Sequence, residues 1–202
     1  MSMIKKGSKG GHMREYPVYS AILARRSIRR FKAISVEHEK IEMLLKAAMA
    51  APSACNLQPW SFIIVDVPDI LAQVKNTTEQ GNYNAPLAIV VCGVYKHIPW
   101  SDEGWRQDCG AAAQNIMLEG TELGLASVCI GGFDENELCK ILEIPDDVHP
   151  ICIIELGYPD YELTPHSWYT QEAVHWQKYD SKKPRLMRTI QMLEDDARSG
   201  KI

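Results

Sequence analysis

Four arginines surround one serine near the beginning of the chain, in the run Arg25-Arg26-Ser27-Ile28-Arg29-Arg30. Each guanidinium offers a planar fork of N–H donors that fits a phosphate group, and the serine hydroxyl adds a neutral donor. A solvated basic surface with weak ion pairs explains such a cluster equally well. Because the chain is acidic overall, with a formal net charge of −4, a nucleic-acid-binding surface is not expected. The cluster predicts a site for the phosphate of a small ligand.

A second polar segment lies between two prolines, Pro52 and Pro59. The first ends a helical pattern and the second precedes an apolar run, so the segment between them is short and stiff. Ser53, Asn56 and Gln58 carry hydrogen-bonding groups without charge, which suits a flat ring with polar edges. An ordinary capped turn has the same composition. For Gln58 in particular, ligand contact and turn stabilisation remain alternatives.

The pair Gly131-Gly132 follows an apolar segment, and backbone without side chains can approach a flat ligand closely. Taken alone, a simple turn at the end of a strand is the better interpretation of this pair. The sequence has no dinucleotide-binding or P-loop glycine motif, no G-x-S-x-G and no H-E-x-x-H. Its six cysteines form no Cys-x-x-Cys pair, so a metal site is not expected. These features favour an enzyme whose cofactor carries the chemistry.

The elements that must position these residues alternate between helices and buried strands, which indicates a helix-covered α/β or α+β sheet. Ser35 is the expected N-cap of the second helix, and Asp134 with Glu137 resembles a capping box. Gly124 is expected at the C′ position of the longest helix. Helices are predicted at 15–25, 36–51, 68–76, 107–123, 135–145 and 185–197, strands at 61–66, 86–94, 126–130 and 149–157, and a loop at 96–106.

The length of 202 residues and the hydrophobic content of 46% suit one domain with terminal arms. Residues 1–13 resemble a disordered arm or a cloning remnant, residues 14–180 the folded domain, and residues 181–202 an unassigned C-terminal extension. No apolar run approaches the roughly 18 residues of a membrane span. No apolar signal-peptide core occurs near the start, so a cytoplasmic location is expected, with neither a membrane nor a nucleic acid as partner.

Five segments, in order along the chain, resemble motifs of the nitroreductase family of flavoproteins. They are residues 25–31, the stretch 51–60 (Ala51-Pro52-Ser53-Ala54-Cys55-Asn56-Leu57-Gln58-Pro59-Trp60), 108–115, 123–127 and 156–159. The resemblance implies an α+β fold: a three-layer α/β/α arrangement with a central, mostly antiparallel sheet, in an intertwined homodimer with FMN at the interface. It also implies that NADH or NADPH delivers hydride to flavin N5, and that a nitroaromatic compound or quinone then takes it in a ping-pong reaction.

The same resemblance implies roles for particular residues, with flavin N5 rather than a side chain as the reactive group. Trp100 and Trp105 are candidates for a substrate lid, although aromatic packing is the commoner role. His166 and Ser167 stand where the family often has basic residues, so phosphate binding would be weaker, or pH-dependent if the imidazole takes part. The expected cofactor contacts are Arg25, Arg26, Ser27, Arg29, Pro52, Ser53, Ala54, Asn56, Gln58, Gly131 and Gly132.

Two alternatives keep the flavin and change the activity. One is a flavin-dependent dehydrogenase or dehalogenase of the same fold, and the other is a non-catalytic flavin-binding redox sensor.

Overall fold

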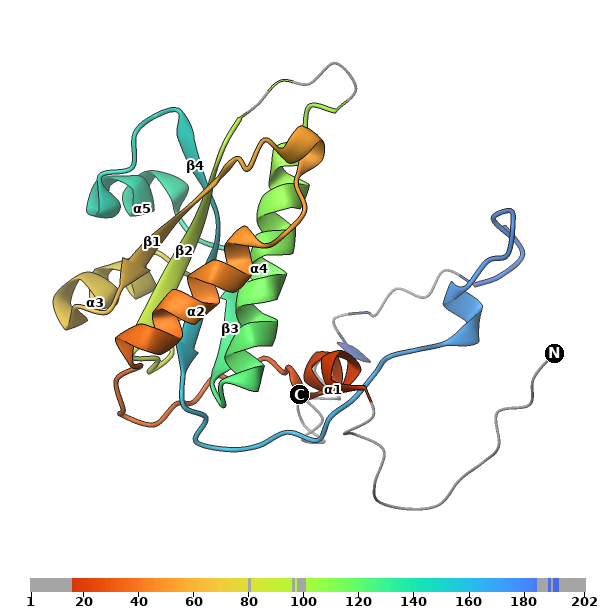
Figure 1. The fold of residues 1–202 in the computed structure, drawn as a ribbon, viewed down its shortest axis with the longest axis horizontal. Helices are drawn as coiled ribbons and strands as arrows, with labels where there is room; N and C mark the ends of the chain where they lie inside the picture. Colours follow the sequence, from red (N-terminus) through yellow and green to blue (C-terminus); the bar gives the residue numbers. More distant parts are fainter. Residues whose placement is uncertain are drawn as a thin grey trace.

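A computed structural model describes residues 16–79, 81–95, 97, 101–184, 189, 191 and 192. Within them the chain forms a four-stranded sheet between two layers of helices (Figure 1). All strand pairs are antiparallel, in the order β1-β2-β4-β3. The strands are β1 (Trp60–Val65), β2 (Leu87–Val94), β3 (Ala126–Ile130) and β4 (Val148–Gly157).

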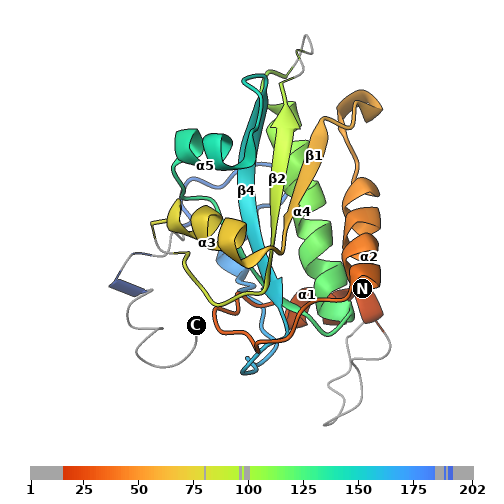
Figure 2. The same ribbon diagram turned by 90° about the vertical axis from the view of Figure 1, so that its left-hand side faces the viewer.

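Helices cover both faces of the sheet (Figure 2). One face carries α2 (His38–Met49) and α4 (Gly104–Glu122), and the other carries α3 (Pro68–Asn76) and α5 (Glu135–Leu142). The first helix, α1 (Pro17–Ala24), lies beside the C-terminal half of α4. The chain after β4 first bonds to the arginine segment and α1, through Asp160 and His166, and then extends away from the body of the fold (Figure 1). This chain end includes one short 3-10 turn, Gln171–Ala173.

The alternation of side chains along the central strands builds two cores, one on each face. In β2, Leu87, Ile89 and Val91 pack toward α2 and α4, while Val90 and Cys92 pack toward α3 and α5. All five side chains are fully buried or nearly so. This two-sided burial explains why the strand appears in the sequence as a continuous apolar run.

The structure confirms the four predicted strands and the predicted ends of two helices. Asp134 caps α5, since its carboxylate accepts a hydrogen bond of 3.0 Å from the backbone N–H of Glu137. Gly124 follows the end of α4 with φ of +75°, a conformation that favours glycine. The division of the chain at residue 180 stays a prediction, and residues 1–13 lie outside the described residues.

Three predicted boundaries are wrong or fall outside the described residues. The N-cap of α2 is Glu37 rather than Ser35, and the hydroxyl of Tyr158, just after β4, lies 2.8 Å from both carboxylate oxygens of Glu37. The segment 104–106 begins α4 instead of ending a loop, and an ion pair of 2.9 Å between Arg106 and Glu103 links its first turn to its N-cap. Most of the predicted helix 185–197 lies outside the described residues.

Two ionisable side chains are buried side by side between the sheet and α3. Glu155 of β4 is fully buried and Lys75 of α3 is 7% exposed, with 3.9 Å between the Lys75 Nζ and the Glu155 Oε2. Lys75 also donates to the carbonyl of Ala85 at 2.6 Å. Burial raises the pKa of Glu155 to about 8, although Lys75 and the backbone of Tyr83 act in the opposite direction. Burial likewise lowers the pKa of Lys75.

Candidate functional site

The arginine segment extends the sheet at its β3 edge. Ser27 forms a parallel bridge with Ser127, and the N–H of Ile28 donates to the Ser127 carbonyl at 3.1 Å. Because side chains alternate along extended backbone, Arg25, Ser27 and Arg29 share one side of this segment. Ile28 points the other way and is buried at 4% exposure. The structure therefore groups three of the four predicted phosphate ligands.

The electrostatics of this group suit an anion. Arg25 is half-buried, and this burial lowers the pKa of its guanidinium, as does the nearby charge of Arg26. A phosphate would offset both effects, since it replaces lost solvation with charge-assisted hydrogen bonds. The Arg29 side chain is exposed, and its Nη1 makes a contact of 3.4 Å with the Ser27 carbonyl.

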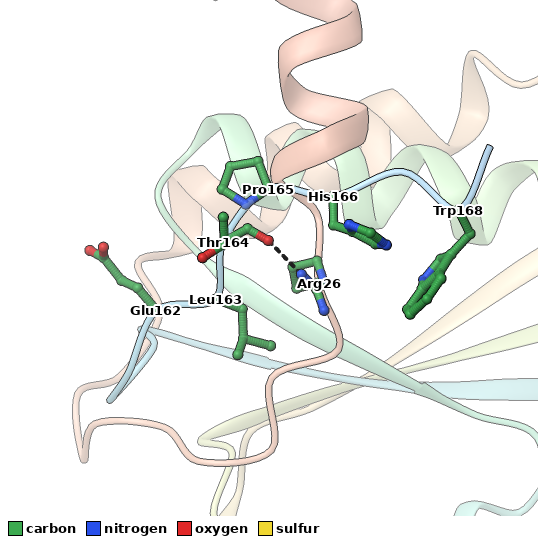
Figure 3. A pocket seen from close by; sticks show the side chains of 7 residues that line it. All are labelled: Arg26, Glu162, Leu163, Thr164, Pro165, His166 and Trp168. Carbon is green, nitrogen blue, oxygen red and sulfur yellow. Dashed lines mark hydrogen bonds between the residues drawn. The ribbon is translucent and has the colours of Figure 1, made fainter. Parts of the chain in front are cut away.

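Arg26 lies on the opposite side and lines a separate pocket of about 530 Å³ (Figure 3). Its Nη1 donates to the carbonyl of Thr164. The imidazole of His166, also in this pocket, meets the indole of Trp168 edge-on, with 4.2 Å between ring centroids. His166 thus lies next to the arginine segment, as its sequence position suggested, but it shares a pocket with Arg26 rather than with Arg25.

The turn between Pro52 and Pro59 has strained backbone. Cys55, Asn56 and Gln58 have φ of 51°, 55° and 48°, in the left-handed region that non-glycine residues rarely occupy. Each such residue costs about 1–3 kcal/mol, and strain of this kind concentrates at functional sites. The side chains of all three residues are exposed. The turn therefore presents an exposed carboxamide pair on a fixed backbone.

Two polar groups hold this strained backbone in place. Asp108, in the second turn of α4, accepts from the Ala54 N–H at 3.2 and 3.1 Å through its two carboxylate oxygens. The Ser53 hydroxyl accepts from the Gln58 N–H at 3.1 Å and keeps its own proton available for a ligand. Sequence reasoning missed the role of Asp108. The sequence placed Asp108 at the start of a helix that carries a family motif. A position in the sequence, however, does not tell how far this carboxylate lies from the turn.

The strained turn and the arginine segment lie at opposite ends of α4 in one chain (Figures 1 and 2). The turn bonds to Asp108 near the start of this helix, whereas Ser27 pairs with Ser127 just beyond its end. With 19 residues, α4 is about 28 Å long. One chain alone does not bring these two parts of the predicted site together.

The predicted glycine pair occupies open surface at the end of β3. Gly131 and Gly132 are both exposed, and a Cβ added to either would meet no atom within 4 Å. Gly131 is four residues beyond Ser127, a distance of about 13 Å along a strand. The phosphate-binding candidates and the glycine pair therefore lie along one strand, with room above the glycines for a flat group.

Comparison with known proteins places the chain in a family. A model described as "Nitroreductase family" matches residues 22–158, which is more than half of the chain. The chain belongs to the nitroreductase family. This match contains the arginine segment, the strained turn and the glycine pair, and it ends before residues 162–166 and 168, which line the Arg26 pocket together with Arg26 itself.

Individual nitroreductase relatives agree with this assignment. The chain is 40% identical over 147 residues to an Archaeoglobus fulgidus protein named NADH dehydrogenase/NAD(P)H nitroreductase, covering 70% of this chain and 84% of that protein. An FMN-dependent nitroreductase from Clostridium difficile R20291 superposes with a TM-score of 0.72 at 32% identity, covering 79% and 98% of the two chains. An iodotyrosine deiodinase from Thermotoga neapolitana is 26% identical over 170 residues, covering 71% and 89%.

Of the two candidate lid tryptophans in this nitroreductase-family chain, the structure describes only Trp105. Trp105 lies in the first turn of α4 and is 5% exposed, and its ring packs against Gly93 of β2. The imidazole of His149 in β4 also packs against the Trp105 indole, with 5.6 Å between the ring centroids. This placement gives Trp105 a packing role, and the predicted lid role remains untested. Trp100 lies outside the described residues.

Two other kinds of functional feature are absent from the part of the chain that the structure describes. No group of three or more His, Cys, Asp or Glu side chains there could hold a metal ion. Likewise, none of the described helices is both long and apolar enough to span a membrane.

Proposed function

We propose that this chain is an FMN-dependent oxidoreductase that takes hydride from NADH or NADPH and reduces nitroaromatic or quinone acceptors, with donor and acceptor using one pocket in turn. When bound, FMN supplies the hydride chemistry, which explains why no catalytic side chain is needed. Membership in the nitroreductase family and relatives named NAD(P)H nitroreductase and FMN-dependent nitroreductase support the class of enzyme.

The observation that carries this proposal is the pairing of the arginine segment with β3. It supports a role for Arg25, Ser27 and Arg29 as the phosphate-binding group, through two guanidinium forks and a hydroxyl. About 13 Å along the strand, Gly131 and Gly132 offer backbone N–H groups and open space for the ring. Because FMN carries its phosphate and its ring at opposite ends, the donor set fits this cofactor.

The strained turn supports a site completed by a second copy of the chain. Asn56 and Gln58 cannot reach the Arg25 group of their own chain, since α4 separates them by most of its length. Nitroreductase-family proteins are typically homodimers with FMN at the interface. In such a homodimer, Ser53, Ala54 and Asn56 of one copy would face a cofactor held mainly by Arg25 of the other.

Exposed apolar side chains indicate where the second copy would pack. Helix α1 has no buried residue within one chain, and its Val18 and Ile22 are 70% and 46% exposed. The segment after β4 exposes large aromatic side chains as well, Trp168, Tyr169, Trp176 and Tyr179. An intertwined homodimer would remove this apolar surface from water.

The first test is spectroscopic. The purified protein incubated with FMN and desalted should keep the visible absorption of a flavin, and NADH or NADPH should bleach it until a quinone restores it. Arg25→Ala should weaken FMN binding by at least tenfold, since charge-assisted hydrogen bonds contribute roughly 1.5–3 kcal/mol each. Arg30→Ala is the matched control, because Arg30 instead pairs with Asp160 at 3.3 Å. A protein that stays colourless after desalting would overturn the proposal.

The second test concerns the shared site. Arg25→Ala and Asn56→Ala would each impair both sites of their own homodimer. Unfolded together and refolded as a mixture, they should recover activity, because half of the dimers then contain one intact site, or about a quarter of all sites. If the mixture is no more active than either variant alone, the two residues do not meet across an interface.

Reductive dehalogenation is a second candidate reaction of the same site. It is favoured by relatives named iodotyrosine deiodinase, which are 26% identical to this chain. Halide release from an iodinated phenol under NADPH, measured beside quinone reduction on one preparation, would distinguish the two activities.

A further inference from the structure

Cys129 differs from the other cysteines in its position and surroundings. It lies in β3, an edge strand of the sheet, and its side chain is exposed. Cys129 pairs with Ile154 of β4, so Cys152, two residues along β4, is its diagonal neighbour on the same face. Cys152 itself is buried at 5% exposure. An exposed thiol and a buried thiol thus lie side by side at the β3 edge.

The bridge between Ser27 and Ser127 brings the arginine segment alongside the same strand. Arg25 and Ser27 then share the side of the sheet toward which Cys129 points. Gly131 is two residues farther along the chain. Cys129 therefore lies between the candidate phosphate-binding group and the candidate ring-binding glycines.

The surroundings favour the thiolate of Cys129. The neighbouring Cys152 thiol lowers the pKa of Cys129, desolvation of the Cys129 thiol opposes this, and the charge of Arg25 lowers the pKa further. The neighbouring Cys129 thiol and burial raise the pKa of Cys152 well above its usual range. Burial also raises the pKa of Cys92 to about 12 and of Cys109 to about 11. Exposed thiols in electropositive surroundings are the reactive ones in proteins.

We propose that Cys129 is a reactive thiol that electrophiles and peroxides modify, and that its modification and the binding of FMN exclude each other. The second half rests on the proposed function, since it requires FMN to cover the strand between Arg25 and Gly131. The thiol has no assigned part in hydride transfer. It is a site through which oxidants or thiol reagents would control loading of the cofactor.

Both reactions balance without a further reactant. With iodoacetamide, the Cys129 sulfur attacks the methylene carbon, the S–C bond forms, iodide leaves, and the thiol proton goes to solvent. With hydrogen peroxide, the sulfur attacks one oxygen and the O–O bond breaks, giving a sulfenic acid and water. The sulfur loses two electrons and the peroxide gains them.

The first experiment measures alkylation at each cysteine by limited iodoacetamide labelling at pH 7, followed by peptide mass spectrometry. Cys55 is the internal reference, because it is also exposed and lies outside the thiol pair. In FMN-free protein, Cys129 should be labelled several-fold faster than Cys55. Equal or slower labelling of Cys129 would overturn the proposal, whatever the cofactor does.

A second arm adds FMN and follows the flavin spectrum in the same samples. Bound FMN should slow labelling of Cys129 at least tenfold, and protein already alkylated at Cys129 should fail to retain FMN after desalting. If the spectrum shows bound FMN while Cys129 labels at its earlier rate, mutual exclusion is refuted and the proposed function stands. If no FMN binds at all, the proposed function fails, and fast labelling of Cys129 would still support the reactive thiol.

Variants then separate the causes of reactivity. Arg25→Gln and Cys152→Ala should each slow labelling of Cys129 in FMN-free protein, while Cys152→Ser, which keeps a donor, should retain most of the rate. Arg30→Gln is the control and should leave the rate unchanged, because this arginine is paired with Asp160. If neither Arg25→Gln nor Cys152→Ala changes the rate at which Cys129 is labelled, the role assigned to these two neighbours is wrong.

Discussion

The buried pair of Glu155 and Lys75 makes the stability of the fold depend on pH in a direction unusual for a carboxylate. Burial raises the pKa of Glu155 from 4.5 to about 8, so the folded protein keeps a proton that the unfolded chain releases. The free energy of unfolding therefore falls as the pH rises from 4.5 to 8. Each pH unit within this window removes up to about 1.4 kcal/mol.

Glu155→Gln tests this directly, because glutamine has the shape of the protonated acid and cannot ionise. Near pH 4.5 the variant and the parent protein should be about equally stable. At pH 7.5 the variant should be more stable by about 4 kcal/mol, the full slope accumulated over about three pH units. Lys75 would keep its 2.6 Å hydrogen bond to the carbonyl of Ala85 in the variant.

Urea unfolding at fixed protein and FMN concentrations, between pH 4.5 and 8, measures these free energies. Glu42→Gln is the matched control. Glu42 is exposed, and its hydrogen bond to Lys46 lowers its pKa, so the pH dependence that it contributes lies below pH 4.5, and its variant should differ from the parent protein by a constant amount between pH 4.5 and 8. If the pH dependence of Glu155→Gln parallels that of the parent protein, Glu155 is ionised in the fold and the assigned desolvation is wrong.

Three further substitutions test other parts of the structure. Asp108→Ala removes both acceptors of the Ala54 N–H in the strained turn, so FMN affinity, measured by fluorescence titration, should fall several-fold while the melting temperature changes little. Gly93→Ala would place a Cβ 2.7 Å from the Trp105 ring, and thermal unfolding should show a loss of about 1–3 kcal/mol. Asn84→Ala breaks two hydrogen bonds of 2.9 and 2.7 Å to Phe31 backbone groups, and urea unfolding should show a loss of about 1–3 kcal/mol.

Local patterns in the sequence determined most of the secondary structure. Continuous apolar runs located the strands because both faces of the sheet are covered, and Asp134 marked a helix start through a bond within its own turn. Prediction failed at Glu37 and at Trp105, which make contacts with residues distant in sequence that no local pattern reveals. Tyr158, which donates to the carboxylate of the N-cap Glu37, is 121 residues away.

The candidate site divides in the same way. The sequence alone supplied its chemistry, a group of arginines with a serine, a carboxamide-bearing turn and a glycine pair, because residue type fixes which groups can donate to a phosphate or a ring. Only the tertiary structure decided which of them meet. Pairing with β3 put Arg25 and Arg29 on one side and Arg26 on the other, and the length of α4 separated them from Asn56. The tertiary structure also placed Cys129 beside Cys152. The register between two strands depends on how the whole sheet packs and on no local pattern in either strand.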